Sequence, residues 1–168
     1  MIEASVLVIF PMLVAFGGVS DLLTMTIQNR VSILLVLGFV ALSLLTDLPL
    51  QGWGTHGLAF LIVFLPCFVF FAAGWMGGGD VKFISSISLW IGFTPELMAF
   101  TVWVAIYGML LTLGLLQLKQ SDFVPSALLR HSWFARLQDR NTGIPYGIAI
   151  AVAGLQVYPE TYWFKLAS

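Results

Sequence analysis

Two aspartates, Asp21 and Asp80, stand apart from the other acidic residues because each lies at the edge of an apolar stretch. Asp21 follows the sequence Gly-Gly-Val-Ser, and Asp80 follows three consecutive glycines. If the fold brings them within a few ångströms, two carboxylates cannot both stay ionised at low cost and tend to share one proton. The ionised member can take a proton from water while the protonated member donates a hydrogen bond to a carbonyl oxygen. This is the chemistry of an aspartyl peptidase, and it requires no metal ion and no cofactor.

The same residues also have a purely structural interpretation. Asp21 could be a carboxylate at a helix end, and Asp80 could be the N-cap of a helix that begins near Val81. Lys82 would then neutralise Asp80 locally or extend to the lipid headgroups, although it could equally steady the ionised form of the pair. Spacing alone favours this structural interpretation.

The glycines before Asp80 favour the catalytic interpretation over the structural one. Consecutive glycines cost backbone entropy and lower helix stability, and a simple cap does not need them. Gly77 and Gly79 are therefore candidate supporting residues that permit close approach of the backbone, with Lys82 as a third. Tight helix packing in a membrane is the alternative reason for small residues here.

Composition indicates a membrane protein. The chain has 168 residues, of which 60% are hydrophobic and 9% charged, and its mean hydropathy is +0.99. A net charge of −1 leaves no basic face for nucleic acid. The single cysteine, Cys67, has no partner for an intrachain disulfide or a zinc site.

The apolar stretches predict an all-α membrane protein, a polytopic bundle of about six transmembrane helices in one domain over residues 1–168. The shortest stretch, 83–93, crosses a membrane only if the preceding residues are helical too. The predicted spans cover residues 5–20, 31–45, 58–73, 83–93, 97–116 and 144–158.

The positions of Lys and Arg predict the orientation. With six crossings, the loops after the first, third and fifth helices share one side, which should be cytoplasmic because basic residues gather there. Only Lys165 falls on the other side, so both termini are expected outside. The basic residues on the first side are Arg30, Lys82, Lys119, Arg130, Arg136 and Arg140.

The one sizeable polar stretch, 117–143, combines basic and aromatic residues. It predicts an interfacial helix in a cytoplasmic loop, with Pro125 as its first residue. Binding to lipid headgroups is the simpler role for this loop, and recognition of a substrate or partner is the alternative.

Three stretches resemble the prepilin peptidases, and especially the short form that serves tight-adherence (Flp) type IVb pili. Residues 21–29 are similar to the family's pattern of Asp followed six residues later by Ile-Pro-Asn, with Gln28 in place of the proline. Residues 77–83 match the Gly-x-Gly-Asp signature followed by lysine, and residues 145–149 resemble its Pro-Tyr-Gly stretch. Their order and spacing agree over most of the chain.

This resemblance implies that Asp21 and Asp80 are catalytic and that the substrate is a prepilin or pseudopilin precursor in the bacterial inner membrane. It implies removal of the basic leader at the cytoplasmic face, leaving a mature pilin with a hydrophobic N-terminal helix. The short connection over residues 22–30 leaves no room for the inserted domain that bifunctional relatives use for N-methylation. We therefore expect a peptidase without methyltransferase activity.

Other functions remain open from the sequence. A presenilin-like intramembrane peptidase shares the Gly-x-Gly-Asp feature but is usually longer. A small carrier or channel subunit could use paired carboxylates to relay protons or bind a cation. A structural pilus-assembly protein would tolerate replacement of both aspartates.

Overall fold

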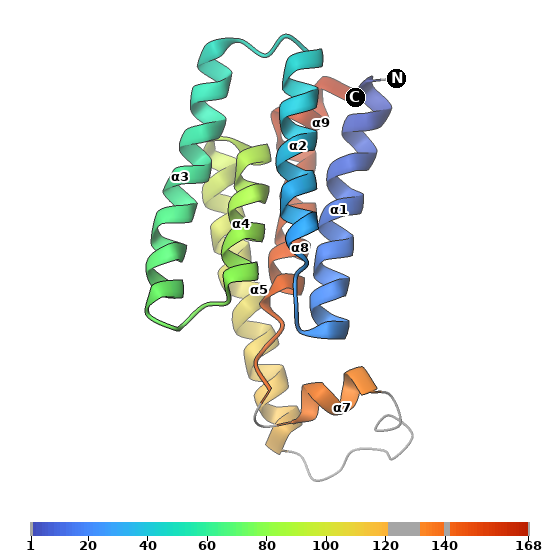
Figure 1. Cartoon of the computed structure of the whole chain (residues 1–168), viewed down its shortest axis with the longest axis vertical. Coiled ribbons are helices and arrows are strands. Elements are labelled where there is room, and N and C mark those ends of the chain that lie inside the picture. Colours follow the sequence, from blue (N-terminus) through green and yellow to red (C-terminus); the bar gives the residue numbers. More distant parts are fainter. Residues whose placement is uncertain (1, 121–131, 140–141, 168) are drawn as a thin grey trace.

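The computed structural model describes residues 2–120, 132–139 and 142–167, which form helices joined by short connections (Figure 1). The prediction of an all-α membrane bundle is confirmed. The helices are α1 (Ile2–Thr24), α2 (Asn29–Leu45), α3 (Leu50–Ala72), α4 (Gly78–Ile91), α5 (Pro95–Gln120), α7 (Ser132–Gln138), α8 (Tyr146–Val157), the 3-10 helix η1 (Tyr158–Glu160) and α9 (Tyr162–Ala167).

The outer surface of the bundle is apolar. Within the described residues, three helices are long and apolar enough to cross a membrane, namely Ser5–Thr24 of α1, all of α3 and all of α5, and α2 is a shorter apolar helix. Large side chains such as Val69 on α3 and Met98 on α5 are well over half exposed. Such surface suits lipid rather than water, and the chain is an integral membrane protein. The prediction of six crossings stays a prediction.

Helix α4 is the centre of the bundle, since it packs against α2, α3 and α8. It spans about 21 Å at 1.5 Å per residue and begins before the predicted stretch 83–93. The buried serines of α4 avoid the free-energy cost of an unsatisfied polar group, because each hydroxyl donates to a carbonyl of the same helix. These bonds join Ser85 to Val81, Ser86 to Lys82 and Ser88 to Ser85, at 2.7, 2.7 and 2.8 Å.

Aromatic residues fill the half of the bundle nearer the termini. The Trp90 indole N–H donates to the Leu35 carbonyl at 2.9 Å, and the Tyr158 hydroxyl donates to the Val6 carbonyl at 2.7 Å. Phe10 stacks on Tyr158 with ring centroids 4.3 Å apart. These contacts join α1, α2, α4 and η1, so the half of the bundle nearer the termini is tightly packed.

Two helix ends differ from the sequence expectation. Helix α1 continues one turn past Asp21 and ends at Thr24. In this turn the Thr24 hydroxyl donates to the Ser20 backbone carbonyl at 2.7 Å. Helix α4 begins at Gly78 with Gly77 at its N-cap, so Asp80 lies in the first turn rather than at the cap of a helix starting near Val81.

The polar stretch 117–143 is described only in part. Helix α5 continues to Gln120, and α7 supplies a short helix further along. The expected helix start at Pro125 lies outside the described residues.

Both termini lie at one end of the bundle, and the end of α1 and the start of α4 lie towards the other (Figure 1). The two aspartates are therefore near the end opposite the termini.

Candidate active site

Asp21 is held in place from two sides. It is only 5% exposed, and its Oδ2 accepts a hydrogen bond of 2.7 Å from the backbone N–H of Gly147 at the start of α8. Directly after α1, Met25 adopts a left-handed conformation (φ 57°), and its N–H donates to the Asp21 carbonyl at 2.8 Å. A left-handed conformation is uncommon for a residue other than glycine and ends the helix sharply. The start of α8 fixes the carboxylate, and the helix end fixes the backbone of Asp21.

Asp80 lies in the first turn of α4, where a negative charge is favoured by the helix dipole. The backbone N–H of Gly77, the N-cap residue, donates to the Asp80 carboxylate. This is the contact that an acidic side chain makes in a capping box. Asp80 as a whole is half-buried.

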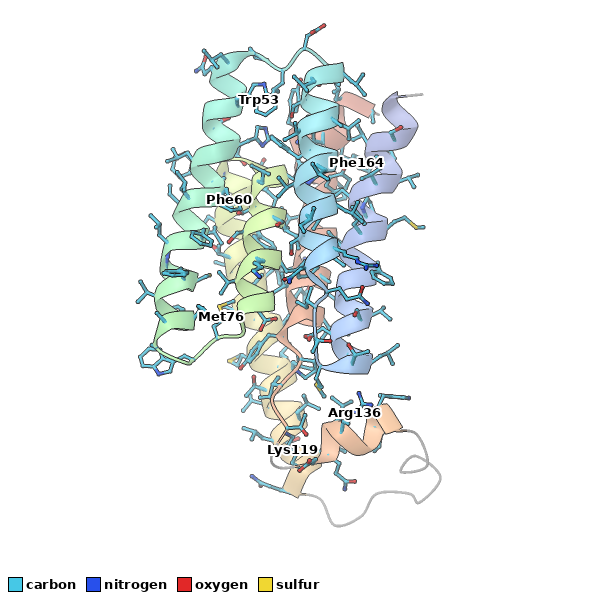
Figure 2. All side chains as sticks on the ribbon, viewed as in Figure 1. Trp53, Phe60, Met76, Lys119, Arg136 and Phe164 are labelled. Carbon is cyan, nitrogen blue, oxygen red and sulfur yellow. The ribbon has the colours of Figure 1, made fainter. Side chains whose placement is uncertain are left out.

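The two aspartates line one cavity of about 660 Å³. The cavity lies where α1, α4 and α8 meet the connection between α3 and α4, and Figure 2 shows Met76 on that connection. The carboxylates also interact electrostatically. The remaining lining is mostly apolar: Met25, Phe70, Gly74, Trp75, Met76, Gly77, Val104, Gly143, Ile144, Pro145, Tyr146 and Ile150. An apolar lining strengthens the coupling between charges, because few water molecules screen it.

The glycines around the aspartates have steric roles. A Cβ atom on Gly77 would lie 2.8 Å from Asp80 Oδ2, and one on Gly79 would lie 3.4 Å from the Ile27 Cβ atom. A Cβ on Gly147 would lie 2.7 Å from Ile27 Cδ1. Ile27 thus fits against the start of α8 because Gly147 lacks a side chain, whereas a Cβ on Gly79 would meet Ile27 at an ordinary contact distance.

Lys82 lies away from the aspartates. Its ammonium group donates to Asn29 Oδ1 at 3.0 Å, and its side chain lines a separate cavity of about 480 Å³ together with Asn29 and Ser32. The contact joins the start of α2 to the start of α4. Among the three supporting residues expected from the sequence, Gly77 adjoins the aspartate pair, Gly79 adjoins Ile27, and Lys82 is not brought to the cavity.

Sequence reasoning gave Gly147 no part in the site, because its contribution is a backbone donor. The signal that could have found it is the Pro-Tyr-Gly stretch that contains it. Its neighbour Tyr146 lines the cavity and contacts the Thr112 hydroxyl at 2.9 Å, which fixes the start of α8 against α5.

Basic residues surround this end of the bundle. Arg136 on α7 donates to the Leu23 carbonyl at 3.4 Å, and Figure 2 shows its side chain between α7 and the end of α1. Lys119 near the end of α5 donates to the Thr142 carbonyl at 2.6 Å. Both basic residues thus lie at the same end of the bundle as the cavity and donate to backbone carbonyls.

Comparison with known proteins gives one family. The type IV leader peptidase family matches residues 7–113, which is more than half of the chain and includes both aspartates. No curated protein and no solved structure matches the chain.

Proposed function

The chain belongs to the type IV leader peptidase family, and on this premise we propose that it is an aspartic endopeptidase with Asp21 and Asp80 as its catalytic pair. The observation that carries the proposal is that both carboxylates line one cavity, although they are 59 residues apart in the sequence. In the described part of the chain, no lysine or arginine forms an ion pair with either carboxylate.

The chemistry follows from a pair that shares one proton. A water molecule between the carboxylates loses a proton to the ionised member as its oxygen attacks the scissile carbonyl carbon. The protonated member donates to the carbonyl oxygen, which becomes the hydroxyl of a tetrahedral intermediate. Collapse of the intermediate breaks the C–N bond and returns one hydroxyl proton to the aspartate that donated it. The proton taken from water passes from the other aspartate to the leaving amine. The reaction consumes one water molecule and needs no metal ion or cofactor.

The proposed substrate is a prepilin or pseudopilin precursor of the Flp type, cut at the cytoplasmic face of the bacterial inner membrane. Family membership supports the substrate class. The orientation is supported by Arg30, Lys82, Lys119 and Arg136, which lie at the same end of the bundle as the aspartates, whereas the termini and Lys165 lie at the other (Figure 1). In this topology six segments cross the membrane and both termini are outside.

We further propose that the chain, as a single transmembrane peptidase domain, does not methylate the mature pilin. The connection between α1 and α2 covers only residues 25–28. It has no space for an inserted cytoplasmic domain.

The test is to co-express the chain with a Flp-type pilin precursor and follow leader removal by gel mobility and mass spectrometry. Asp21→Asn and Asp80→Asn should each abolish processing. The matched control is Asp47→Asn, because Asp47 is exposed between α2 and α3 at the opposite end and asparagine tolerates its positive φ of 50°. Normal leader removal by either Asp21→Asn or Asp80→Asn would contradict the proposal.

A further inference from the structure

Three helices that line the cavity at the aspartates also line a second cavity of about 710 Å³. This second cavity lies between α3, α4 and α5, nearer the end of the bundle that holds the termini. Helix α3 packs on α4, whereas α5 packs mainly on α8, and this division leaves a space between α3 and α5.

The two cavities adjoin one another along all three helices. Residues three or four positions apart lie on the same face of a helix, and each helix contributes such a pair, one residue to each cavity. The pairs are Ile84 and Asp80 on α4, Cys67 and Phe70 on α3, and Thr101 and Val104 on α5. We call these two adjoining cavities together the α3–α5 cleft.

The cleft changes in character along its length. Near the aspartates it holds two carboxylates, whereas none of the residues that line the second cavity is charged. From Ile62 to Phe70 the wall formed by α3 measures about 12 Å at 1.5 Å per residue. That length accepts about eight residues of an α-helix.

We propose that the α3–α5 cleft binds the apolar helix of the substrate that directly follows the scissile peptide bond. This inference rests on the proposed function, because the position of the second cavity beside the aspartates is what identifies the occupant as substrate. An apolar cleft inside a membrane cannot accept an extended chain, whose backbone groups would lose their hydrogen bonds, whereas a helix satisfies them internally. The helix must end where the cleft becomes polar, and that point places an unwound peptide bond at Asp21 and Asp80.

The single cysteine of the chain provides a direct probe. Cys67 lines the second cavity three residues before Phe70, which lines the aspartate cavity, and this separation is about 4.5 Å along α3. A precursor with one cysteine about one helical turn after its cleavage site should therefore form a disulfide with Cys67 on oxidation with copper phenanthroline. Disulfide formation requires the two Cα atoms to come within about 7 Å. When the cysteine is moved along the precursor helix, the disulfide yield should be high at every third or fourth position, where the cysteine faces Cys67.

The disulfide experiment uses the full chain carrying Asp80→Asn, so that the precursor stays uncut. The unsubstituted chain is assayed in parallel for leader removal. The matched control moves the thiol to the lipid-facing side of α3 by Cys67→Ala with Val69→Cys, since Val69 is 62% exposed. We expect the Cys67 product to exceed the Val69→Cys product at least about tenfold.

The outcomes separate the two proposals. If the unsubstituted chain removes the leader but Cys67 and Val69→Cys react equally, the cleft proposal is overturned and the peptidase proposal stands. A Cys67-to-Cys67 dimer that forms without precursor and persists in its presence would assign the cleft to a second copy instead. Failure of the unsubstituted chain to remove the leader overturns both.

A second variant tests the cleft by occlusion. Thr101→Phe places a ring in the cleft, and Val102→Phe places the same ring on the half-exposed neighbouring face of α5. We expect Thr101→Phe to slow leader removal at least about tenfold and Val102→Phe to leave it unchanged. Equal rates in two variants present at equal amounts in the membrane would overturn the proposal.

Discussion

The backbone N–H of Gly147 donates to Asp21 Oδ2 at 2.7 Å, and this bond joins residues 126 positions apart. It connects the last turn of α1 to the first turn of α8. One oxygen of the Asp21 carboxylate is thereby fixed by the backbone, which leaves the other for a reacting group. The aspartate pair thus depends on a residue near the C-terminal end of the chain.

Replacement of Gly147 by alanine should therefore damage the site specifically. The new Cβ would lie 2.8 Å from Asp21 Oδ2 and 2.7 Å from Ile27 Cδ1, so the carboxylate must move. A displacement of about 1 Å can cost roughly a hundredfold in rate, and we expect at least a tenfold loss in leader removal, measured by pulse-labelling of the precursor. Gly143→Ala is the control, because it lines the same cavity and has nothing within 4 Å of a new Cβ. Similar rates for both alanine variants would contradict this role of Gly147.

Gly77→Ala should impair the other aspartate. Its Cβ would lie 2.8 Å from Asp80 Oδ2, the oxygen nearest the N-cap. We expect a lower kcat with little change in KM, because the carboxylate is displaced while the cavity keeps its shape. Gly114→Ala, on the open face of α5, provides the comparison. An unchanged kcat for Gly77→Ala would show that Asp80 does not need its present position.

Lys82 should act through Asn29 rather than through the aspartates. Because its ammonium group donates to Asn29 Oδ1 at 3.0 Å, removal of either partner should have nearly the same modest effect. We expect Lys82→Met, Asn29→Ala and the double variant to reduce leader removal by less than about tenfold each, and the double variant to be no worse than the singles. A hundredfold loss confined to Lys82→Met would assign Lys82 to the reaction instead.

Trp90→Phe should lower stability without changing the reaction. Trp90 is fully buried, its indole N–H donates to Leu35, and its ring contacts Phe10, Phe39 and Trp163. Loss of the hydrogen bond and of packing volume should cost about 1–3 kcal/mol, seen as a lower Tm in detergent. Trp75→Phe, at a position 79% exposed, should leave Tm within about a degree. Equal Tm values would contradict the structural role of Trp90.

The sequence predicted the helical class because hydropathy acts over many residues. The two aspartates that line one cavity stood out in the sequence because each lies at the edge of an apolar stretch. It placed helix ends less well, since local hydrogen bonds decide them: Thr24 extends α1 beyond Asp21, and Gly77 caps α4 before Asp80. It could not predict the Gly147 donor, because every residue except proline carries the same backbone N–H. The hydrogen-bond partner of Lys82 could not be predicted from the sequence either, since Asn29 is 53 positions away.

The most direct test of the catalytic pair is the rate of leader removal by purified chain in lipid vesicles, compared for Asp21→Asn, Asp80→Asn and the double variant. Groups that act as one unit are not additive, so removing either should cost as much as removing both. We predict that all three variants fall to the same background rate. A single variant that keeps a substantial share of the unsubstituted rate would contradict catalysis by the Asp21 and Asp80 pair.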